Sequence, residues 1–447
     1  MGGIKELTQT DKKSVSFYRI SQFMGQETLG GILLILATLI AVIWANSSFH
    51  DLYHYFTHEI RLGTTFGDFH FSLHDWVNDW LMALFFFTIG LEIKREVMGG
   101  ELSSVKKAAL PVMAAIGGMV VPAVIFLLFN AGNPDYSAGW GIPMATDIAF
   151  ALGILALLGN RVNINLKIFL TALAIADDLG AILVIAVFYT DTINYLQLGL
   201  AMATLAVLIA GNRMGIRSAL FYWIIGTVGV WLTFFFSGVH ATIAGVLIAF
   251  TIPARTKISE NDYIDSLHTL LTKFKVEKQN DSKLLTKEQA HLIEKIETLG
   301  NDAQTPLQRL EHILHPISAF IIIPVFALFN AGVRIEGNII DMILHPISLG
   351  IIAGLMLGKF IGISIFSHLI IKMRLAALPV GMGFRDIYGA ALLAGIGFTM
   401  SIFISDLAFS DPQLIQIAKV GIFTASILSA VLGVLILLSG KDTKKLD

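Results

Sequence analysis

Apolar stretches of membrane-spanning length recur along the chain, and polar segments separate them. Twelve can be counted, and we interpret each as a transmembrane helix, because a helix needs about 20 apolar residues to cross the hydrocarbon core. The pattern predicts an all-α polytopic membrane protein whose transmembrane domain occupies residues 29–439. The predicted spans are 29–46, 75–98, 108–130, 141–159, 166–189, 194–211, 218–236, 240–252, 315–332, 346–371, 388–406 and 416–438.

The composition supports this interpretation. Hydrophobic residues make up 55% of the 447 positions and charged residues 14%, whereas soluble domains carry about 25% charge. The chain has no cysteine, which excludes disulfide bonds, thiolate metal sites and cysteine nucleophiles. The polar N-terminal tail, residues 1–28, lacks a small-residue cleavage site before the first apolar stretch, so we expect no cleaved signal peptide.

Lysine and arginine set the predicted orientation. If the N-terminal tail is cytoplasmic, 27 of the 31 basic residues fall in cytoplasmic segments. Arg61, Arg334 and Lys419 fall outside, and Lys359 lies within a span. This distribution follows the positive-inside rule and predicts that the C-terminal tail 440–447 is cytoplasmic as well. An arrangement with eleven spans would place that basic tail outside.

The outer loop 47–74 has the pattern of a short β-hairpin. Apolar residues alternate with polar ones from Phe69 to Leu73, and Gly67-Asp68 is a turn sequence. We expect this hairpin to pair with a second copy of the chain in a homodimer.

The segment 256–313 is predicted to be a hydrophilic cytoplasmic insertion in the transmembrane domain. Ile264 and Leu271 fall on one helical face, and Thr286 with Gln289 forms a capping-box pattern ahead of an apolar run. We expect two or three amphipathic helices here, with disorder in the polar run KVEKQNDSK between them.

Two adjacent acidic residues lie near the middle of the fifth predicted span. Asp177 and Asp178 are the ninth and tenth of the twenty residues from Phe169 to Phe188, and the only charged ones among them. An ionised carboxylate at that depth costs roughly 2.5–3.5 kcal/mol. The pair therefore indicates a cation or proton site at the membrane midplane. The alternative is a pair of structural carboxylates hydrogen-bonded inside the bundle.

Two of the predicted spans contain interruptions. The fourth carries Pro143, Thr146 and Asp147 ahead of its apolar half, and the eleventh carries Gly395 and Gly397. Interrupted segments in separate halves of a transporter are typical of a site built from half-helices. We therefore predict that these two helices are discontinuous. Ordinary glycine-mediated helix packing is the alternative.

Lys359 is a basic residue in the middle of the tenth predicted span. Its depth favours pairing with a carboxylate, and one lysine neutralises one of Asp147, Asp177 and Asp178. At least one aspartate is then left for a proton or a hard cation. Na⁺ and Li⁺ require oxygen ligands, which the carboxylates, Thr146 and unwound backbone carbonyls supply, and no His/Cys cluster competes for a transition metal.

Further titratable residues lie toward the ends of the spans. Glu92 and Glu96 share a helical face at the cytoplasmic end of the second span, and Glu311 precedes the ninth. His240 lies at an outer span end, where a histidine titrates near neutrality. Each of these residues belongs either to a pH response or to the solvated end of a span.

Motifs along the whole chain resemble those of the bacterial sodium/proton antiporters of the NhaA type. They occur in that family's order and cover nearly all the predicted spans. The motifs are GLEIKREV, AAIGGMVVPA, ATDIAFALGILALLG, ALAIADDLGAI, SGVHATIAGV, PLQRLEHILHP, NAGV and GIGFTMSIFI. The resemblance implies inverted repeats around a midplane site.

The resemblance also implies roles for individual residues. By position, Asp178 and Asp177 match the cation and proton carboxylates, Thr146 and Asp147 the first broken helix, and Lys359 the lysine of the tenth span. The chain departs from the family pattern in a longer insertion at about 257–305. Positions tied to the pH response of the family are matched by Glu92, Glu96, His240 and Glu311.

The sequence therefore predicts a secondary antiporter of the bacterial inner membrane, not an enzyme. It is expected to export Na⁺ or Li⁺ in exchange for imported protons, electrogenically and under pH control, with no cofactor and no nucleic-acid partner. An intramembrane aspartyl protease also needs two membrane aspartates, but on separate helices and with a GxGD motif, which this sequence lacks. A sodium-coupled symporter of a related fold is the other alternative.

Overall fold

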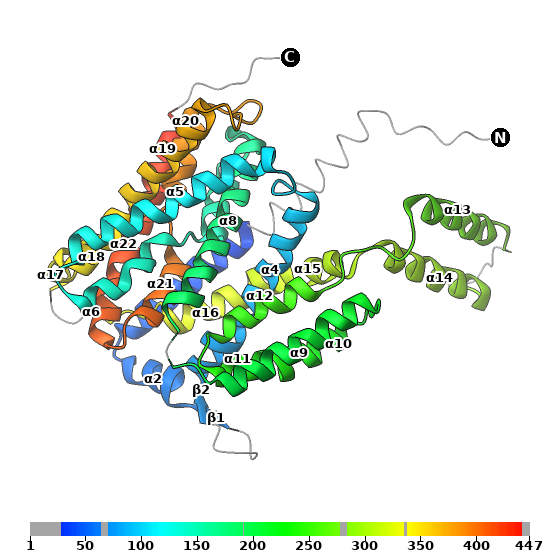
Figure 1. The fold of residues 1–447 in the computed structure, drawn as a ribbon, viewed down its shortest axis with the longest axis horizontal. Helices are drawn as coiled ribbons and strands as arrows, with labels where there is room; N and C mark the ends of the chain where they lie inside the picture. The colour runs from blue at the N-terminus through cyan, green and yellow to red at the C-terminus, as the bar shows by residue number, and fades with distance from the viewer. Residues whose placement is uncertain (1–27, 64–69, 191, 278–283, 335–337, 440–447) are drawn as a thin grey trace.

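The protein is predominantly helical, and most of its helices pack into one bundle (Figure 1). The computed structural model describes residues 28–63, 70–190, 192–277, 284–334 and 338–439. Within these ranges nine helices are long and apolar enough to cross a membrane, or eleven if each of two bent helix pairs counts as one span. The prediction of an all-α polytopic membrane protein is confirmed.

The nine candidate spans are of two kinds. Five are continuous α-helices: Thr28–Ala45, α5 (Val105–Asn130), α8 (Ile164–Phe188), α9 (Tyr195–Arg213) and α22 (Pro412–Leu438). Four contain a π-helical turn, a local irregularity that is frequent at functional sites. These four are α3–η2–α4 (Leu73–Asp75, Trp76–Leu81, Met82–Gly99), α10–η5–α11 (Ala219–Ile224, Ile225–Trp231, Leu232–Ser237), α15–η6–α16 (Pro306–Ile317, Ser318–Ile322, Ile323–Asn330) and α18–η7–α19 (Pro346–Ile352, Ala353–Gly358, Lys359–Lys372).

Short polar side chains cap the N-termini of several of these spans. Asn163 caps α8, Asn194 caps α9 and Asp411 caps α22, each accepting a hydrogen bond from a backbone N–H of the first helical turn. Such caps satisfy donors that have no partner within the helix. Pro412 follows its cap at the first helical position, where a proline costs no hydrogen bond.

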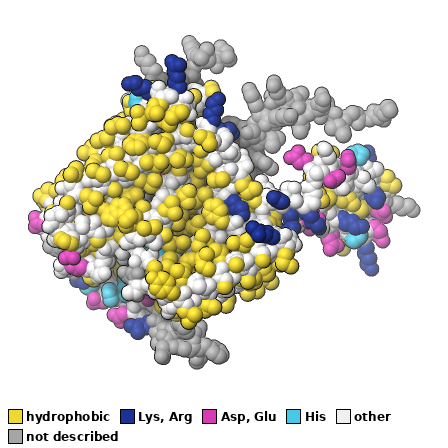
Figure 2. Space-filling model, viewed as in Figure 1, with side chains coloured by type: hydrophobic (Ala, Val, Ile, Leu, Met, Phe, Trp, Pro, Cys, Tyr) yellow, Lys and Arg dark blue, Asp and Glu magenta, His cyan; other side chains and the backbone are white. Residues whose placement is uncertain are grey.

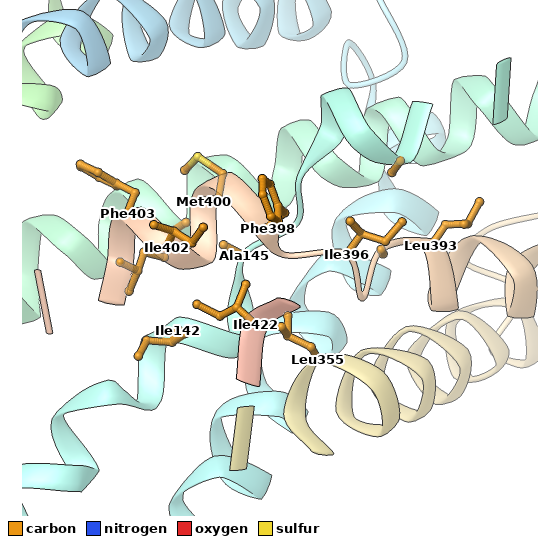
Figure 3. Packing of buried hydrophobic residues seen from close by; sticks show 14 of the residues in the cluster. Ile142, Ala145, Leu355, Leu393, Ile396, Phe398, Met400, Ile402, Phe403 and Ile422 are labelled. Atoms are coloured by element: carbon orange, nitrogen blue, oxygen red, sulfur yellow. The ribbon is translucent and has the colours of Figure 1, made fainter. Parts of the chain in front are cut away.

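Two helix pairs are bent where the sequence predicted interruptions. The chain turns by 42° between Pro134–Met144, which comprises α6 (Pro134–Ser137) and η3 (Ala138–Met144), and α7 (Ile148–Leu157). It turns by 48° between α20 (Phe384–Leu393) and α21 (Phe398–Ala408). The two breaks meet inside the bundle, and Figure 3 shows buried hydrophobic side chains such as Ile142, Phe398 and Ile402 packed around them.

Helices α5 and α19 cross with their backbones in direct contact. A methyl group on Gly362 would overlap the carbonyl oxygen of Gly117, and one on Gly117 would overlap that of Gly362. Glycine is therefore required at both positions, because any side chain would separate the helices.

A small sheet and short helices lie at one end of the bundle. Strand β1 (Arg61–Gly63) pairs antiparallel with β2 (His70–Ser72), and Leu62 is opposite Phe71. The predicted turn at Gly67-Asp68 lies outside the described residues, as does Phe69.

The remaining short elements are α2 (His50–His54), η1 (Tyr55–Glu59), η4 (Gly159–Arg161), α12 (Ala241–Thr251) and α17 (Ile339–Leu344).

The hydrophilic insertion forms a helical arm that projects from the bundle (Figure 1). Its helices are α13 (Glu260–Val276) and α14 (Lys287–Ala303), and the predicted capping box at Thr286 and Gln289 is present. Residues 278–283, in the run where disorder was expected, lie outside the described ranges, as do the tail residues 1–27 and 440–447.

The predicted start of the ninth span, residue 315, is wrong. The helix begins at Pro306, where Thr305 and Gln308 form a capping box, and continues to Asn330. The apolar pattern missed the first three turns because polar residues such as Glu311 occupy them.

Charge is distributed unevenly over the surface of the bundle. Figure 2 shows a broad belt of hydrophobic side chains, with Lys and Arg gathered at its upper and right margins and Asp, Glu and His at its lower left. A belt of this kind suits the hydrocarbon interior of a bilayer, and its charged margins suit the two interfaces.

Candidate functional site

Asp147 joins the two broken helices. Its Oδ1 accepts a hydrogen bond of 2.9 Å from the N–H of Phe150, which caps α7. Its Oδ2 accepts from the N–H of Thr399 at 3.0 Å and from the Thr399 hydroxyl at 2.6 Å. The N–H of Asp147 donates to the carbonyl of Ile396. The carboxylate thus lies at the first turns of both α7 and α21, where helix dipoles favour negative charge.

Lys359 connects the same crossing to the aspartate pair. Its Nζ lies 2.5 Å from Asp177 Oδ2 and 2.9 Å from the hydroxyl of Thr146. Thr146 in turn donates to the carbonyl of Ala394 at the C-terminal end of α20, where a positive charge is favoured. Lys359 was expected to pair with one of Asp147, Asp177 and Asp178, and its partner in the structure is Asp177.

Asp178 has a different environment from Asp177. Both side chains are 1% exposed, and each has an Oδ1 without a hydrogen-bond partner among the described residues. Asp178 lines a cavity of about 110 Å³, whereas Asp177 and Lys359 do not. Other residues that line the cavity are Thr146, Asp147, Thr399, Glu92, Arg95, Glu311 and His315.

The donor set around this cavity suits a small hard cation. Carboxylate and hydroxyl oxygens come from Asp178, Asp147, Thr146 and Thr399. Na⁺ and Li⁺ prefer such oxygen ligands. In the part of the chain that the structure describes, no three His, Cys, Asp or Glu residues are placed to hold a metal ion together.

A cluster of charged and titratable residues also lines the cavity. Arg95 forms ion pairs with Glu96, at 2.9 Å, and with Glu311. His315 lies 4.0 Å from Glu92. The structure therefore brings together three of the four residues assigned to the pH response, and it adds Arg95 and His315 to them.

His240, the fourth of these residues, lies elsewhere. It precedes α12, and its Nε2 is 2.8 Å from the carbonyl oxygen of Tyr189 at the end of α8. The hydroxyl of Tyr189 in turn donates to the carbonyl of Ala138, in η3. His240 therefore belongs to the packing between α8, α12 and η3.

Thr399 was not predicted as a site residue. Its partner Asp147 is 252 positions away in the sequence, so no local pattern connects the two residues. Thr399 follows the interruption at Gly395 and Gly397, and the prediction of a site built from two discontinuous helices was the signal that could have found it.

Comparisons with known proteins agree with the motifs and the site. The family model described as Na⁺/H⁺ antiporter 1 matches residues 21–437. The Na⁺/H⁺ antiporter NhaA 1 of Psychromonas ingrahamii is 50% identical over 419 residues, which cover 93% of this chain and 95% of that protein. The Na⁺/H⁺ antiporter NhaA of Oleidesulfovibrio alaskensis is 48% identical over 442 residues, 97% of each chain. The corresponding protein of Wolinella succinogenes is 46% identical over 439 residues, 97% of this chain and 93% of that protein. The chain therefore belongs to the Na⁺/H⁺ antiporter family of the NhaA type.

Proposed function

We propose that this protein exports Na⁺ or Li⁺ across the bacterial inner membrane in exchange for protons. Family membership supports Na⁺/H⁺ exchange. The observation that carries the site assignment is the difference between the two aspartates. Asp177 is neutralised by Lys359, whereas Asp178 lines the cavity and forms no ion pair among the described residues.

In the proposed mechanism, Na⁺ binds the Asp178 carboxylate and the oxygens around it. Proton and cation compete for the same oxygen, so protonation of Asp178 releases the ion. The buried Asp177–Lys359 pair accepts the second proton, and the two aspartates and the lysine titrate as one coupled system. Two protons then enter for each Na⁺ expelled, so the exchange carries current.

We also propose that the ion site opens alternately to the two sides of the membrane. The cavity leads from Asp178 toward Glu92, Arg95 and Glu311, which we assign to the cytoplasmic side together with both termini. We further propose twelve spans in inverted repeats, with the eleven-residue α12 as the shortest and the two bent pairs as discontinuous spans. Movement of these helices against the rest of the bundle would open the site to the other side.

Two finer assignments belong to this proposal. The cluster of Glu92, Glu96 and Glu311 around Arg95 supports a role in the pH response, because each ion pair in it depends on the protonation of a carboxylate. The strand pair β1–β2 supports a homodimer, because its outer edges offer unpaired backbone groups to a second copy.

The symporter alternative conflicts with the size of the cavity. A volume of about 110 Å³ suits an ion with its ligands, whereas sites for organic ligands occupy about 300–1,000 Å³. The protease alternative needs aspartates that face each other from separate helices, and here both lie on α8.

The test uses everted membrane vesicles that contain the full chain. Addition of Na⁺ with no organic solute present should release protons from the vesicle lumen, and the rate should change when a K⁺ ionophore clamps the membrane potential. Asp178→Asn should abolish both the pH change and calorimetric Na⁺ binding, since it removes the charge while keeping the shape. Asp135→Asn, on the exposed α6, is the matched control. Retained Na⁺ binding in Asp178→Asn would refute the site assignment, and insensitivity to the potential would refute the stoichiometry.

A further inference from the structure

A second cavity, distinct from the ion site, lies between the ends of three spans. Its volume is about 660 Å³, and its wall comes from α5, α8 and the segment that follows α19. It shares no lining residue with the cavity at Asp178. Most of the wall is apolar, and includes Leu110, Pro111, Ile168, Phe169, Ala172 and Leu378.

The rim of this cavity is basic. Lys106, Lys107 and Arg374 line it, against a single acidic residue, Glu101, so the lining carries a net charge of +2. Glu101 is 3.8 Å from Lys107 and offsets that charge in part. The side chains of Lys106 and Arg374 are exposed and make no ion pair or hydrogen bond within the described ranges.

The lysines occupy an unfavourable place in their own helix. Lys106 and Lys107 lie in the first turn of α5, which begins at Val105. The first turn carries the positive end of the helix dipole and favours anions over cations. The first turn of α5 contains no acidic residue, so an anion in the cavity would offset the charge of Lys106 at this helix end.

Arg374 occupies an unfavourable backbone conformation. Its φ of 59° is left-handed, and within the described residues it is the single non-glycine position with positive φ. Its N–H donates to the carbonyl of Ile371, and that of Leu375 to Ile370, which is the hydrogen-bond pattern that usually ends a helix at glycine. A residue with a Cβ at such a position costs stability, which favours a role for the arginine side chain that glycine could not supply.

We propose that this cavity binds the phosphate-bearing headgroup of an anionic phospholipid. Lys106, Lys107 and Arg374 hold the phosphate, and the acyl chains lie along the apolar wall. The apolar wall favours a lipid over a free phosphate ion, and Ile168 and Leu375, 41% and 54% exposed, lead from the cavity to the hydrophobic surface. Basic pockets between spans at the Lys- and Arg-rich side of a membrane protein are suited to such headgroups.

The test is native mass spectrometry of the detergent-purified full chain, titrated with phosphatidylglycerol, phosphatidylcholine or inorganic phosphate. Phosphatidylglycerol should bind in preference to phosphatidylcholine, and millimolar phosphate should not displace it. Lys106→Gln combined with Arg374→Gln should weaken phosphatidylglycerol binding about 25-fold, since each lost charge near a membrane surface is worth about fivefold. The control Arg161→Gln, an exposed basic residue that does not line the cavity, should change it less than twofold.

A second variant keeps the proposal testable if the double variant does not fold. Arg374→Gly relieves the left-handed backbone, so its unfolding temperature without lipid should equal or exceed that of the parent. The rise in unfolding temperature on adding phosphatidylglycerol should be smaller than in the parent. Equal binding of the two lipids, displacement by phosphate, or an undiminished lipid response in Arg374→Gly would each overturn the proposal.

Discussion

The contact between Thr399 and Asp147 offers a direct test of how the two broken helices are held together. Thr399→Val removes the hydroxyl that lies 2.6 Å from Asp147 Oδ2 and keeps nearly the same shape. Two backbone donors, from Thr399 and Phe150, still reach the carboxylate. The variant should therefore fold, with one buried hydrogen bond fewer.

The expected cost follows from the charge and burial of the acceptor. A hydrogen bond to a charged group contributes about 1.5–3 kcal/mol, and both residues are buried. Asp147→Asn should cost more, about 2–5 kcal/mol, because the amide offers one acceptor oxygen where two are used, and because two helix N-termini lose their compensating charge. We therefore expect Thr399→Val to lower the free energy of unfolding by less than Asp147→Asn does.

Denaturant titration in detergent micelles would measure the free energy of unfolding of both variants and of their combination. We expect the double variant to cost less than the two single costs added, because residues in one buried network are coupled. Thr399→Ser, which keeps the hydroxyl, is the matched control. A cost below roughly 0.5 kcal/mol for Thr399→Val, which is the range of surface substitutions, or full additivity of the two costs, would refute the idea that this contact joins the breaks.

Three further predictions test other parts of the molecule. Lys359→Ala should move the pH profile of Na⁺/H⁺ exchange in everted vesicles to higher pH, because an unpaired buried carboxylate holds its proton more strongly; an unchanged profile would remove Lys359 from the mechanism. Deletion of residues 62–73 should yield monomers that still exchange ions, and a fully dimeric deletion variant in detergent would exclude the strand pair as the contact. Burial and the neighbouring His74 lower the pKa of His58 from 6.5 to about 4, so the unfolded chain binds a proton that the folded chain does not. Stability should therefore fall as the pH drops through that window, and His58→Gln should flatten the fall while His291→Gln, on the exposed α14, leaves it unchanged.

The polar residues at membrane depth were predictable from the sequence because the bilayer makes them costly. Asp177, Asp178 and Lys359 stand out against apolar neighbours, and the two interruptions stand out by their Pro, Gly and Asp residues. The position of these residues in the middle of their spans does not determine which aspartate forms the ion pair with Lys359. That choice depends on the rotation of α8 about its axis, which only the packing of its neighbours fixes.

Long-range contacts and span ends were harder to predict. The hydrogen bonds between Asp147 and Thr399 join residues far apart in the chain, and no local pattern encodes them. The start of the ninth span was missed because a glutamate at position 311 suggests a solvent-exposed segment, although Glu311 is buried and forms an ion pair with Arg95. His240 was grouped with the glutamates by resemblance, and sequence position could not show that it lies against Tyr189 instead.

The glycine contact between α5 and α19 determines how far Lys359 can reach. Gly118 lies beside the lysine stem, and a methyl group there would be 3.6 Å from its Cδ. Lys359 is on α19 and Asp177 is on α8, and α5 packs against both helices. The contact between Gly117 and Gly362 therefore holds α19 close enough for the ammonium of Lys359 to reach Thr146 and Asp177. A wider spacing would lengthen a 2.5 Å contact beyond hydrogen-bond range. Two residues without side chains thus help to fix the distance between the ammonium of Lys359 on α19 and the carboxylate of Asp177 on α8.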